Sequence, residues 1–326
     1  MLRKVFSALF LMIIIVGLVT GCAQQQPVKR QQQILYSATD ARGKQLSFAA
    51  KPQKIVSCFV FADEVLLDLV PHSHIAGMDK WIHDAELSSA ATEAADVKTV
   101  VEVNTESIAK LQPDLVLLPD STRPELVAAL EDLKIKVYLY KNAHLLSDIE
   151  TMIQSLAQAV DEPEKGEKLI RDYKNDLAAL KKMQLPGRPE EKAILFLRFG
   201  AIGGRGTIYH DVLTTMGFRD AYEEGRQTGG TLARNTSSIL SKEEVVKCNP
   251  DIFIMGLWTQ GGSYKDSEQQ LQDIYNDQAY ASVNAVINRK AYIVPQRYVN
   301  CLSHHAGKNM LELAQILNAR LKGHTK

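Results

Sequence analysis

The stretch TESIAKLQPDLVLLP (Thr105–Pro119) returns in altered form as KEEVVKCNPDIFIMG (Lys242–Gly256). Each copy contains a glutamate, six further residues, Pro-Asp and an apolar run typical of a buried strand. A helix, a proline stop and a strand recur by chance in α/β proteins, which accounts for the Pro-Asp alone. Chance accounts less easily for Glu106 and Glu243 at the same helical position. The repetition therefore predicts two similar lobes.

Further apolar runs alternate with helical patterns on both sides of this pair, which favours α/β lobes with mainly parallel sheets. The predicted strands are residues 54–58, 74–78, 114–119, 135–140, 192–199, 251–256 and 291–295. The predicted helices of the first half include residues 62–70 and 123–133.

The middle of the chain breaks the alternation. Ser147 with Glu150 three residues later has the spacing of a capping box, and helical periodicity without a strand follows. We therefore predict an N-terminal α/β lobe over 36–145, a connecting helix and a following helix over 146–184, and a C-terminal α/β lobe over 185–326. A ligand cleft is expected between the lobes.

The N-terminus has the pattern of an export signal. Arg3 and Lys4 precede an apolar stretch over 5–19 that is short for a membrane span, and small residues lead to Cys22. The stretch Val19–Cys22 resembles the bacterial lipobox, which implies a signal peptide over 1–21 and a diacylated Cys22 thiol. An ordinary secretory signal is the alternative. Residues 22–35 are predicted to form a flexible tether, which places the mature chain on the outer face of the cytoplasmic membrane.

Composition narrows the class of protein. The 326 residues are 45% hydrophobic, enough for a large core, and 38 basic residues balance 38 acidic ones. No basic stripe stands out, so nucleic acid is not an expected partner. Beyond Cys22 the chain has Cys58, Cys248 and Cys301, which are far apart in sequence. One disulfide among them and three free thiols both remain open.

The order of several motifs resembles the substrate-binding lipoproteins of ABC importers for ferric siderophores, haem and cobalamin. The resemblance covers nearly the whole mature chain and rests on DARGKQLSFAAKPQKIVS, HIAGMD, LKIKVYLY, FLRFG, RKAYIVP and the two repeated segments. It departs at MGFRDAY (Met216–Tyr222), where the family often has paired glycines and an asparagine. The family implies two lobes joined by one long helix, with the ligand between them.

The resemblance also implies partners. They are a two-fold permease with its cytoplasmic ATPase, a small-molecule metal chelate and, through the lipid, the membrane. Glu106 and Glu243 match the positions at which family members dock against arginines of the permease dimer. A monomer is expected, with no cofactor apart from the transported ligand.

Candidate ligand contacts lie on the loops that follow the predicted strands. Arginine suits anionic chelates or haem propionates, aromatic faces suit macrocycles or catechol rings, and tyrosine or histidine can coordinate a metal. Arginine and tyrosine content favours a ferric siderophore, with haem and cobalamin as alternatives. Because His304 and His305 are adjacent, at most one should face the cleft. The candidates are Phe59, Phe61, Trp81, Arg198, Arg205, Tyr209, Trp258, Tyr298 and His304.

Two other classes of function fit less well. The segment GAIGGRG lacks the setting and the lysine of a phosphate-binding loop, and we find no serine elbow and no spacing typical of metal ligands, so an enzyme is not expected. The eight histidines do not gather into a set of three or four matching positions, which argues against binding of a bare transition metal.

Overall fold

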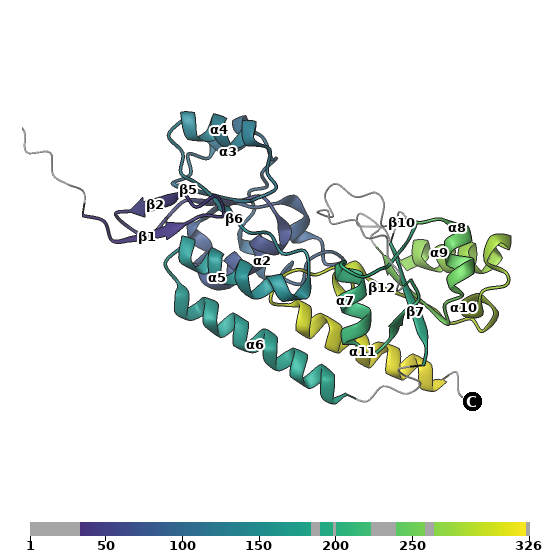
Figure 1. Ribbon diagram of the computed structural model, residues 1–326. Coiled ribbons are helices and arrows are strands. Elements are labelled where there is room, and N and C mark those ends of the chain that lie inside the picture. Colours follow the sequence, from purple (N-terminus) through teal and green to yellow (C-terminus); the bar gives the residue numbers. More distant parts are fainter. Residues whose placement is uncertain (1–32, 184–189, 198–199, 223–238, 258–263, 324–326) are drawn as a thin grey trace, which may run out of the picture.

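The computed structural model describes residues 33–183, 190–197, 200–222, 239–257 and 264–323. Two lobes lie side by side, and two helices, α6 and α11, run along one side of both (Figure 1). The predicted signal peptide, Cys22, Arg198 and Trp258 lie outside the described residues. Within the described ranges, no helix has both the length and the apolar character needed to cross a membrane.

The first lobe contains a parallel sheet and an antiparallel hairpin. Four parallel strands follow the order β4-β3-β5-β6, and β1 pairs with β2 in the hairpin. The strands are β1 Tyr36–Thr39, β2 Gln45–Phe48, β3 Ile55–Ser57, β4 Ile75–Gly77, β5 Leu115–Pro119 and β6 Val137–Tyr140. The helices are α2 Val60–Leu69, α3 Thr105–Lys110, α4 Pro124–Asp132 and α5 Ile149–Ala159.

Both faces of this sheet are covered, which explains its continuously apolar strands. In β5, Leu115 and Leu117 join the core cluster that contains residues of α2 and α5. Val116 and Leu118 join a second cluster with residues of α3 and α4. Alternate side chains of one strand therefore anchor two helical layers.

The second lobe has a mixed sheet in the order β10-β8-β7-β11-β12, with β9 also paired to β7. Strands β9, β7, β11 and β12 are parallel, whereas β8 and β10 add an antiparallel edge. The strands are β7 Lys192–Leu197, β8 Gly200–Ile202, β9 Arg219–Asp220, β10 Ile239–Leu240, β11 Ile252–Leu257 and β12 Ala291–Pro295. The helices are α7 Ile208–Thr215, α8 Lys242–Cys248, α9 Tyr264–Asn276, α10 Asn284–Ile287 and α11 Ala306–Gly323.

The repeated segments form the same structure in both lobes, α3–β5 and α8–β11. Gln112 (φ 50°) and Asn249 (φ 45°) leave each helix in the left-handed conformation just before Pro-Asp. Asp114 then accepts the backbone N–H of Lys54 at 3.0 Å, and Asp251 accepts that of Lys192 at 2.9 Å. In each lobe the aspartate thus ties the start of one strand to its parallel neighbour.

The long helix α6, Pro163–Lys182, connects the lobes and packs against both α5 and α11. A Cβ at Gly166 would lie 2.5 Å from Ala157 Cβ on α5. A Cβ at Gly307 would lie 2.9 Å from the carbonyl oxygen of Tyr173. Glycine at these two positions permits the close helix contacts. The predicted fold of two α/β lobes and one connecting helix is confirmed.

The start of α5 differs from the predicted capping box. A short 3₁₀ turn, Leu146–Asp148, leads directly into the helix. Asp148 Oδ2 accepts the backbone N–H groups of His144 and Leu145, both at 3.1 Å. Asp148 therefore fixes this turn, where the sequence pattern had suggested Ser147 and Glu150.

Candidate binding cleft and interlobe seam

A cavity of about 370 Å³ lies between the lobes. It is floored by the chain around the start of α2 and walled by loops that follow strands of the first lobe, while α7 and the segment before α11 close it from the second lobe. Its size and apolar lining are typical of a small-molecule site. The lining residues are Phe59, Val60, Phe61, Trp81, Leu87, Pro119, Ser121, Asn142, Ala143, His144, Tyr209, Asn300 and Leu302.

Four of the lining side chains are aromatic: Phe59, Phe61, Trp81 and Tyr209. Phe59 and Phe61 meet edge to face with centroids 5.4 Å apart. Trp81 is held in a 3₁₀ turn, Lys80–His83, by a bond from its backbone N–H to Asp79 Oδ1 at 2.8 Å. Such a surface can stack on the flat face of a macrocycle or aromatic ligand.

Uncharged polar groups complete the described lining. Among the described residues, the cavity wall contains no lysine, arginine, aspartate or glutamate. His144, in the loop after β6, is half-buried and contributes the imidazole of this wall. It is a candidate to coordinate a metal carried by the ligand.

A buried acid lies close to this floor, one turn into α2. Asp63 is fully buried, and its Oδ2 accepts the backbone N–H of Asp79 at 2.8 Å. Burial raises the pKa of Asp63 well above its usual value, and this hydrogen bond only partly opposes the shift. Burial also raises the pKa of the fully buried Tyr140.

The predicted contacts divide between the cavity and other places. Phe59, Phe61, Trp81 and Tyr209 all line the cavity. Burial raises the pKa of Tyr209 to about 12, which keeps its phenol protonated at neutral pH.

The remaining described candidates do not line the cavity. Arg205 is exposed in the turn before α7. Tyr298 donates its hydroxyl to Glu312 on α11 at 3.0 Å. His304 lies beside Asp68 at the far end of α2.

Sequence reasoning missed several wall residues, and one signal for them was present. Asn142, Ala143 and His144 follow β6 just as Ser121 follows β5, so the rule that sites lie after parallel strands would have included them. Asn300 and Leu302 lie in the segment that follows the parallel strand β12, so the same rule points to them as well.

Behind the cavity, the lobes meet along a polar contact that we call the interlobe seam. Its centre is Glu64 of α2, which is fully buried. Glu64 Oε1 accepts Ser88 Oγ at 3.0 Å and the backbone N–H of Ser89 at 2.7 Å, and Oε2 accepts the hydroxyl of Ser303 from the second lobe. Burial raises the pKa of Glu64, although these donors oppose the rise.

The rest of the seam is a chain of hydrogen bonds between the lobes. Asn309 Nδ2 donates to Ser89 Oγ at 2.8 Å and to the carbonyl oxygen of Arg297 at 3.0 Å. The backbone N–H of Arg297 donates to the carbonyl of Glu86 at 2.8 Å, and its guanidinium donates to the carbonyl of Ala85. Arg297 therefore links the two lobes through its backbone and its guanidinium.

The thiols also lie in the structural framework. Cys58, Cys248 and Cys301 are all free, and Cys58 and Cys301 are buried. Cys301 Sγ lies 3.7 Å from Glu64 Oε2 in the seam, and burial raises its pKa above the usual range of a thiol. The alternative of a disulfide among the three is therefore wrong.

Comparison with known proteins identifies the family of this chain. Residues 55–298 match the model of a family described as periplasmic binding protein, so the chain belongs to that family. It is 24% identical over 328 residues to the uncharacterized ABC transporter substrate-binding lipoprotein YvrC of Bacillus subtilis (strain 168), covering 95% of each chain. It is 36% identical over 129 residues to a vitamin B12-binding protein of Vibrio parahaemolyticus, covering 36% of this chain and 46% of that protein, less than half its length.

Solved structures agree on the fold. The periplasmic heme-binding protein RhuT from Roseiflexus sp. RS-1, in its apo form, superposes with a TM-score of 0.63 over 82% of this chain and 98% of that one. The two sequences are 18% identical, so this similarity concerns the fold alone.

Proposed function

We propose that this protein is the extracytoplasmic substrate-binding component of an ABC importer and that it captures a metal chelate between its lobes. The cavity of aromatic and uncharged groups, built from both lobes, carries the proposal. Family membership and the names of the relatives support it. The role is binding and delivery, with no catalytic step.

We infer further that the ligand is a tetrapyrrole complex. A ferric siderophore was the first expectation from arginine and tyrosine content. However, Arg205 is exposed, Arg297 is bonded within the seam, and Tyr298 is bonded to Glu312. The uncharged described lining favours a large macrocycle of low charge, for which cobalamin is the best match. Haem is the next, with its macrocycle against the aromatic wall and its two anionic propionates directed away from the described lining.

Titration separates these ligands. Cyanocobalamin, haemin and a ferric tris-catecholate would each be added to the purified protein, with tryptophan fluorescence as the readout. We expect saturable quenching by a tetrapyrrole, and a loss of about 10- to 100-fold in affinity for Phe59→Ala. If only the catecholate binds tightly, the ligand is a ferric siderophore and the tetrapyrrole inference is wrong. If none of the three chelates binds, the proposed function is wrong.

His144 is proposed as the protein ligand to the metal of that complex. His144→Ala should change the visible spectrum of bound haemin, because axial ligation sets that spectrum. His74→Ala, a half-buried histidine outside the cavity wall, is the matched control. An unchanged spectrum in the His144 variant would show that another group, or none, coordinates the iron.

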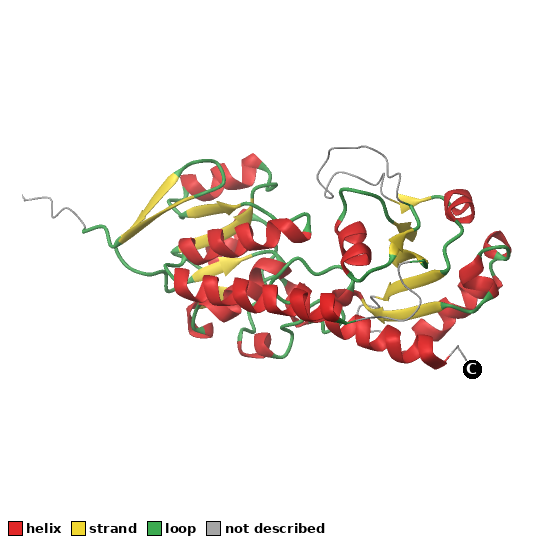
Figure 2. Cartoon of the chain, turned by 60° about the horizontal axis from the view of Figure 1, so that its bottom comes forward, coloured by secondary structure: helices red, strands yellow, loops and turns green. Residues whose placement is uncertain are grey.

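We propose that Glu106 and Glu243 dock the protein on a two-fold permease. Both are exposed in the first turns of the equivalent helices α3 and α8. These helices lie on the side of the molecule opposite α6 and α11 (Figures 1 and 2). Neither carboxylate forms a hydrogen bond or ion pair with another described residue. A helix dipole alone would favour each glutamate by about 0.3–1 kcal/mol.

Charge reversal tests this docking role. Glu106→Arg with Glu243→Arg should abolish uptake and importer-stimulated ATP hydrolysis, while ligand affinity and melting temperature hold. Glu164→Arg with Glu268→Arg makes the same change of charge on exposed residues of α6 and α9 and should leave uptake intact. Normal transport by the first variant would refute docking through these residues.

The membrane anchor is proposed to be the lipid on Cys22. Cys22→Ser should give a folded, ligand-competent protein that leaves the membrane fraction, because the tether contributes no core. Fractionation of cells checks this, with processing of the signal followed by mass. A variant that is processed but stays with the membrane would exclude lipidation as the anchor.

A further inference from the structure

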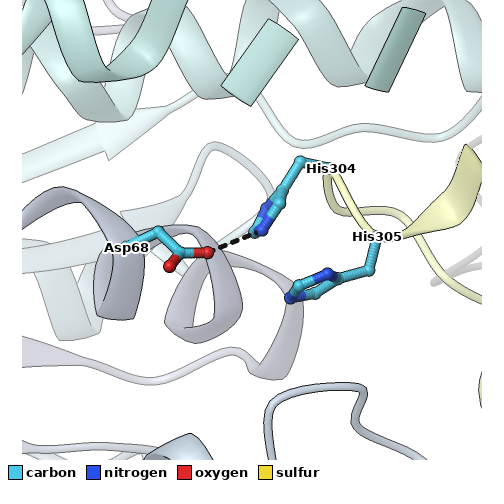
Figure 3. Close-up of side chains that lie close together, drawn as sticks. All are labelled: Asp68, His304 and His305. Carbon is cyan, nitrogen blue, oxygen red and sulfur yellow. Dashed lines mark ion pairs between the residues drawn. The ribbon is translucent and has the colours of Figure 1, made fainter. Parts of the chain in front are cut away.

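A cluster of metal-ligating side chains lies at the C-terminal end of α2, apart from the residues that line the cavity. Asp68 of α2 meets His304 and His305, which precede α11 (Figure 3). One ligand atom from each of the three residues lies within 4.8 Å of the others. None of the three lines the cavity between the lobes.

The geometry within the cluster leaves coordinating atoms available. His304 is 8% exposed, and its Nε2 lies 2.8 Å from Asp68 Oδ2. Neither ring nitrogen of His304 forms an aligned hydrogen bond with a described residue. Figure 3 shows the His304 ring next to that of His305, and their ring centroids are 3.9 Å apart. His304 Nδ1 has no partner among the described residues, and a buried ring nitrogen without one is costly unless something else satisfies it.

We propose that Asp68, His304 and His305 bind a divalent transition metal such as Zn²⁺. Two imidazoles and one carboxylate are a common donor set for such ions, with a fourth position open to water. Ligand atoms in a tetrahedral zinc site are about 3.4 Å apart, given bonds of about 2.0–2.1 Å. The separations in the cluster, up to 4.8 Å, must shorten to reach that size, which requires side-chain rotation. The Asp68 side chain, 49% exposed, has the freedom to make it and gives the ion a path from solvent.

Nearby lysines do not block the ion, because each faces a carboxylate of its own. Lys168 Nζ lies 2.6 Å from Asp172, and Lys308 Nζ lies 4.0 Å from Glu312. Their positive charge is therefore partly neutralised near the cluster.

The three side chains of the proposed metal site come from both lobes. Asp68 belongs to the first lobe, whereas His304 and His305 belong to the segment that leads from the second sheet into α11. Ser303, the residue before them, already bonds to Glu64 across the seam. A metal held there would join the lobes beside the seam and favour this arrangement over a more open one. The ion would bind outside the cavity that holds the transported ligand.

Cobalt is a suitable probe because its visible bands report ligand number and geometry. The full chain, purified without a histidine tag, would be titrated with Co²⁺ and then with Zn²⁺ as a competitor. We expect one Co²⁺ per chain with bands of a four-coordinate site, displaced by Zn²⁺, and a higher melting temperature with either ion. Asp68→Asn and His305→Ala should each weaken binding by about 100-fold or more.

Two controls locate the ion. His72→Ala with His74→Ala removes another histidine pair, one member of which lies 3.6 Å from Asp96, and should leave binding intact. His144→Ala removes the histidine of the cavity and should also leave binding intact. Unchanged affinity in both Asp68→Asn and His305→Ala, or an equal loss in either control, would overturn the proposal. Circular dichroism confirms folding, and the half-exposed Asp68 makes Asp68→Asn decisive if His305→Ala fails to fold.

Discussion

The helix α2 serves two regions of opposite character, the cavity at its N-terminal end and the seam along its middle. The cavity presents Phe59 and Phe61 as unbonded apolar surface, whereas the seam surrounds Glu64 with donors from both lobes. An apolar wall can accept a ligand without breaking internal hydrogen bonds. A buried polar contact, by contrast, is costly to break and fixes one arrangement. The difference suggests that α2 separates ligand binding from the fastening of the lobes.

Glu64→Leu should have the largest effect on stability. It leaves Ser88 Oγ, the Ser89 N–H and the Ser303 hydroxyl without their acceptor, at a total cost of about 3–5 kcal/mol. Glu64→Gln keeps an acceptor and should cost about 1–2 kcal/mol. Urea denaturation measures both. Equal, small losses would mean that the seam does not hold the lobes.

Asp63→Asn should change how stability depends on pH. Because burial raises the pKa of Asp63 in the folded state, the folded protein binds this proton more tightly than the unfolded chain. Its contribution to stability is full below the unfolded pKa of about 3.9 and is lost as the pH rises through the raised folded pKa. Within that window the loss is about 1.4 kcal/mol per pH unit.

Denaturation at several pH values compares Asp63→Asn with the wild type. The stability of the variant relative to the wild type should rise with pH across this window, because asparagine carries no such proton. A constant difference from pH 4 to pH 8 would show that Asp63 does not titrate differently on folding.

Tyr298→Phe should cost about 1 kcal/mol in stability and leave ligand affinity unchanged. The variant loses the bond to Glu312, which lies on α11 and away from the cavity wall. Denaturation and ligand titration are both needed. A tenfold loss of ligand affinity in Tyr298→Phe would show that Tyr298 contacts the ligand, as predicted from the sequence.

Trp81→Ala should have the smallest effect on stability, within about 1 kcal/mol. It should nevertheless lower the affinity for the ligand about 10- to 100-fold. Its half-buried ring lines the cavity and packs under Lys80 Nζ at 4.4 Å. Tyr36→Ala, an aromatic change on the hairpin of the first lobe, is the control and should leave affinity unchanged. If Trp81→Ala binds as tightly as the wild type, the ligand does not use this wall.

Local signals in the sequence predicted the fold and four of the residues that line the cavity, Phe59, Phe61, Trp81 and Tyr209. Apolar runs marked the main strands, and the repeated Glu…Pro-Asp pattern marked two lobes whose aspartates have the same role. Loops after strands pointed to Phe59, Trp81 and Tyr209, because the carboxyl edge of a parallel sheet is where such sites form. The strands β8 and β10 went unpredicted, since antiparallel edges of two or three residues carry little periodicity.

The sequence by itself determined the two lobes, the long connecting helix and the equivalence of Glu106 and Glu243, because these follow from periodicity and repetition along the chain. Only the tertiary structure decided where Tyr298 and His304 point. Each lies in the second lobe near a predicted ligand loop, yet Tyr298 turns to Glu312 and His304 to Asp68. Asp68 and His304 are 236 residues apart, and they meet because α2 and α11 both pack against α6 and His304 lies just before α11. A contact between residues so far apart in the sequence produces no periodic pattern from which it could be predicted.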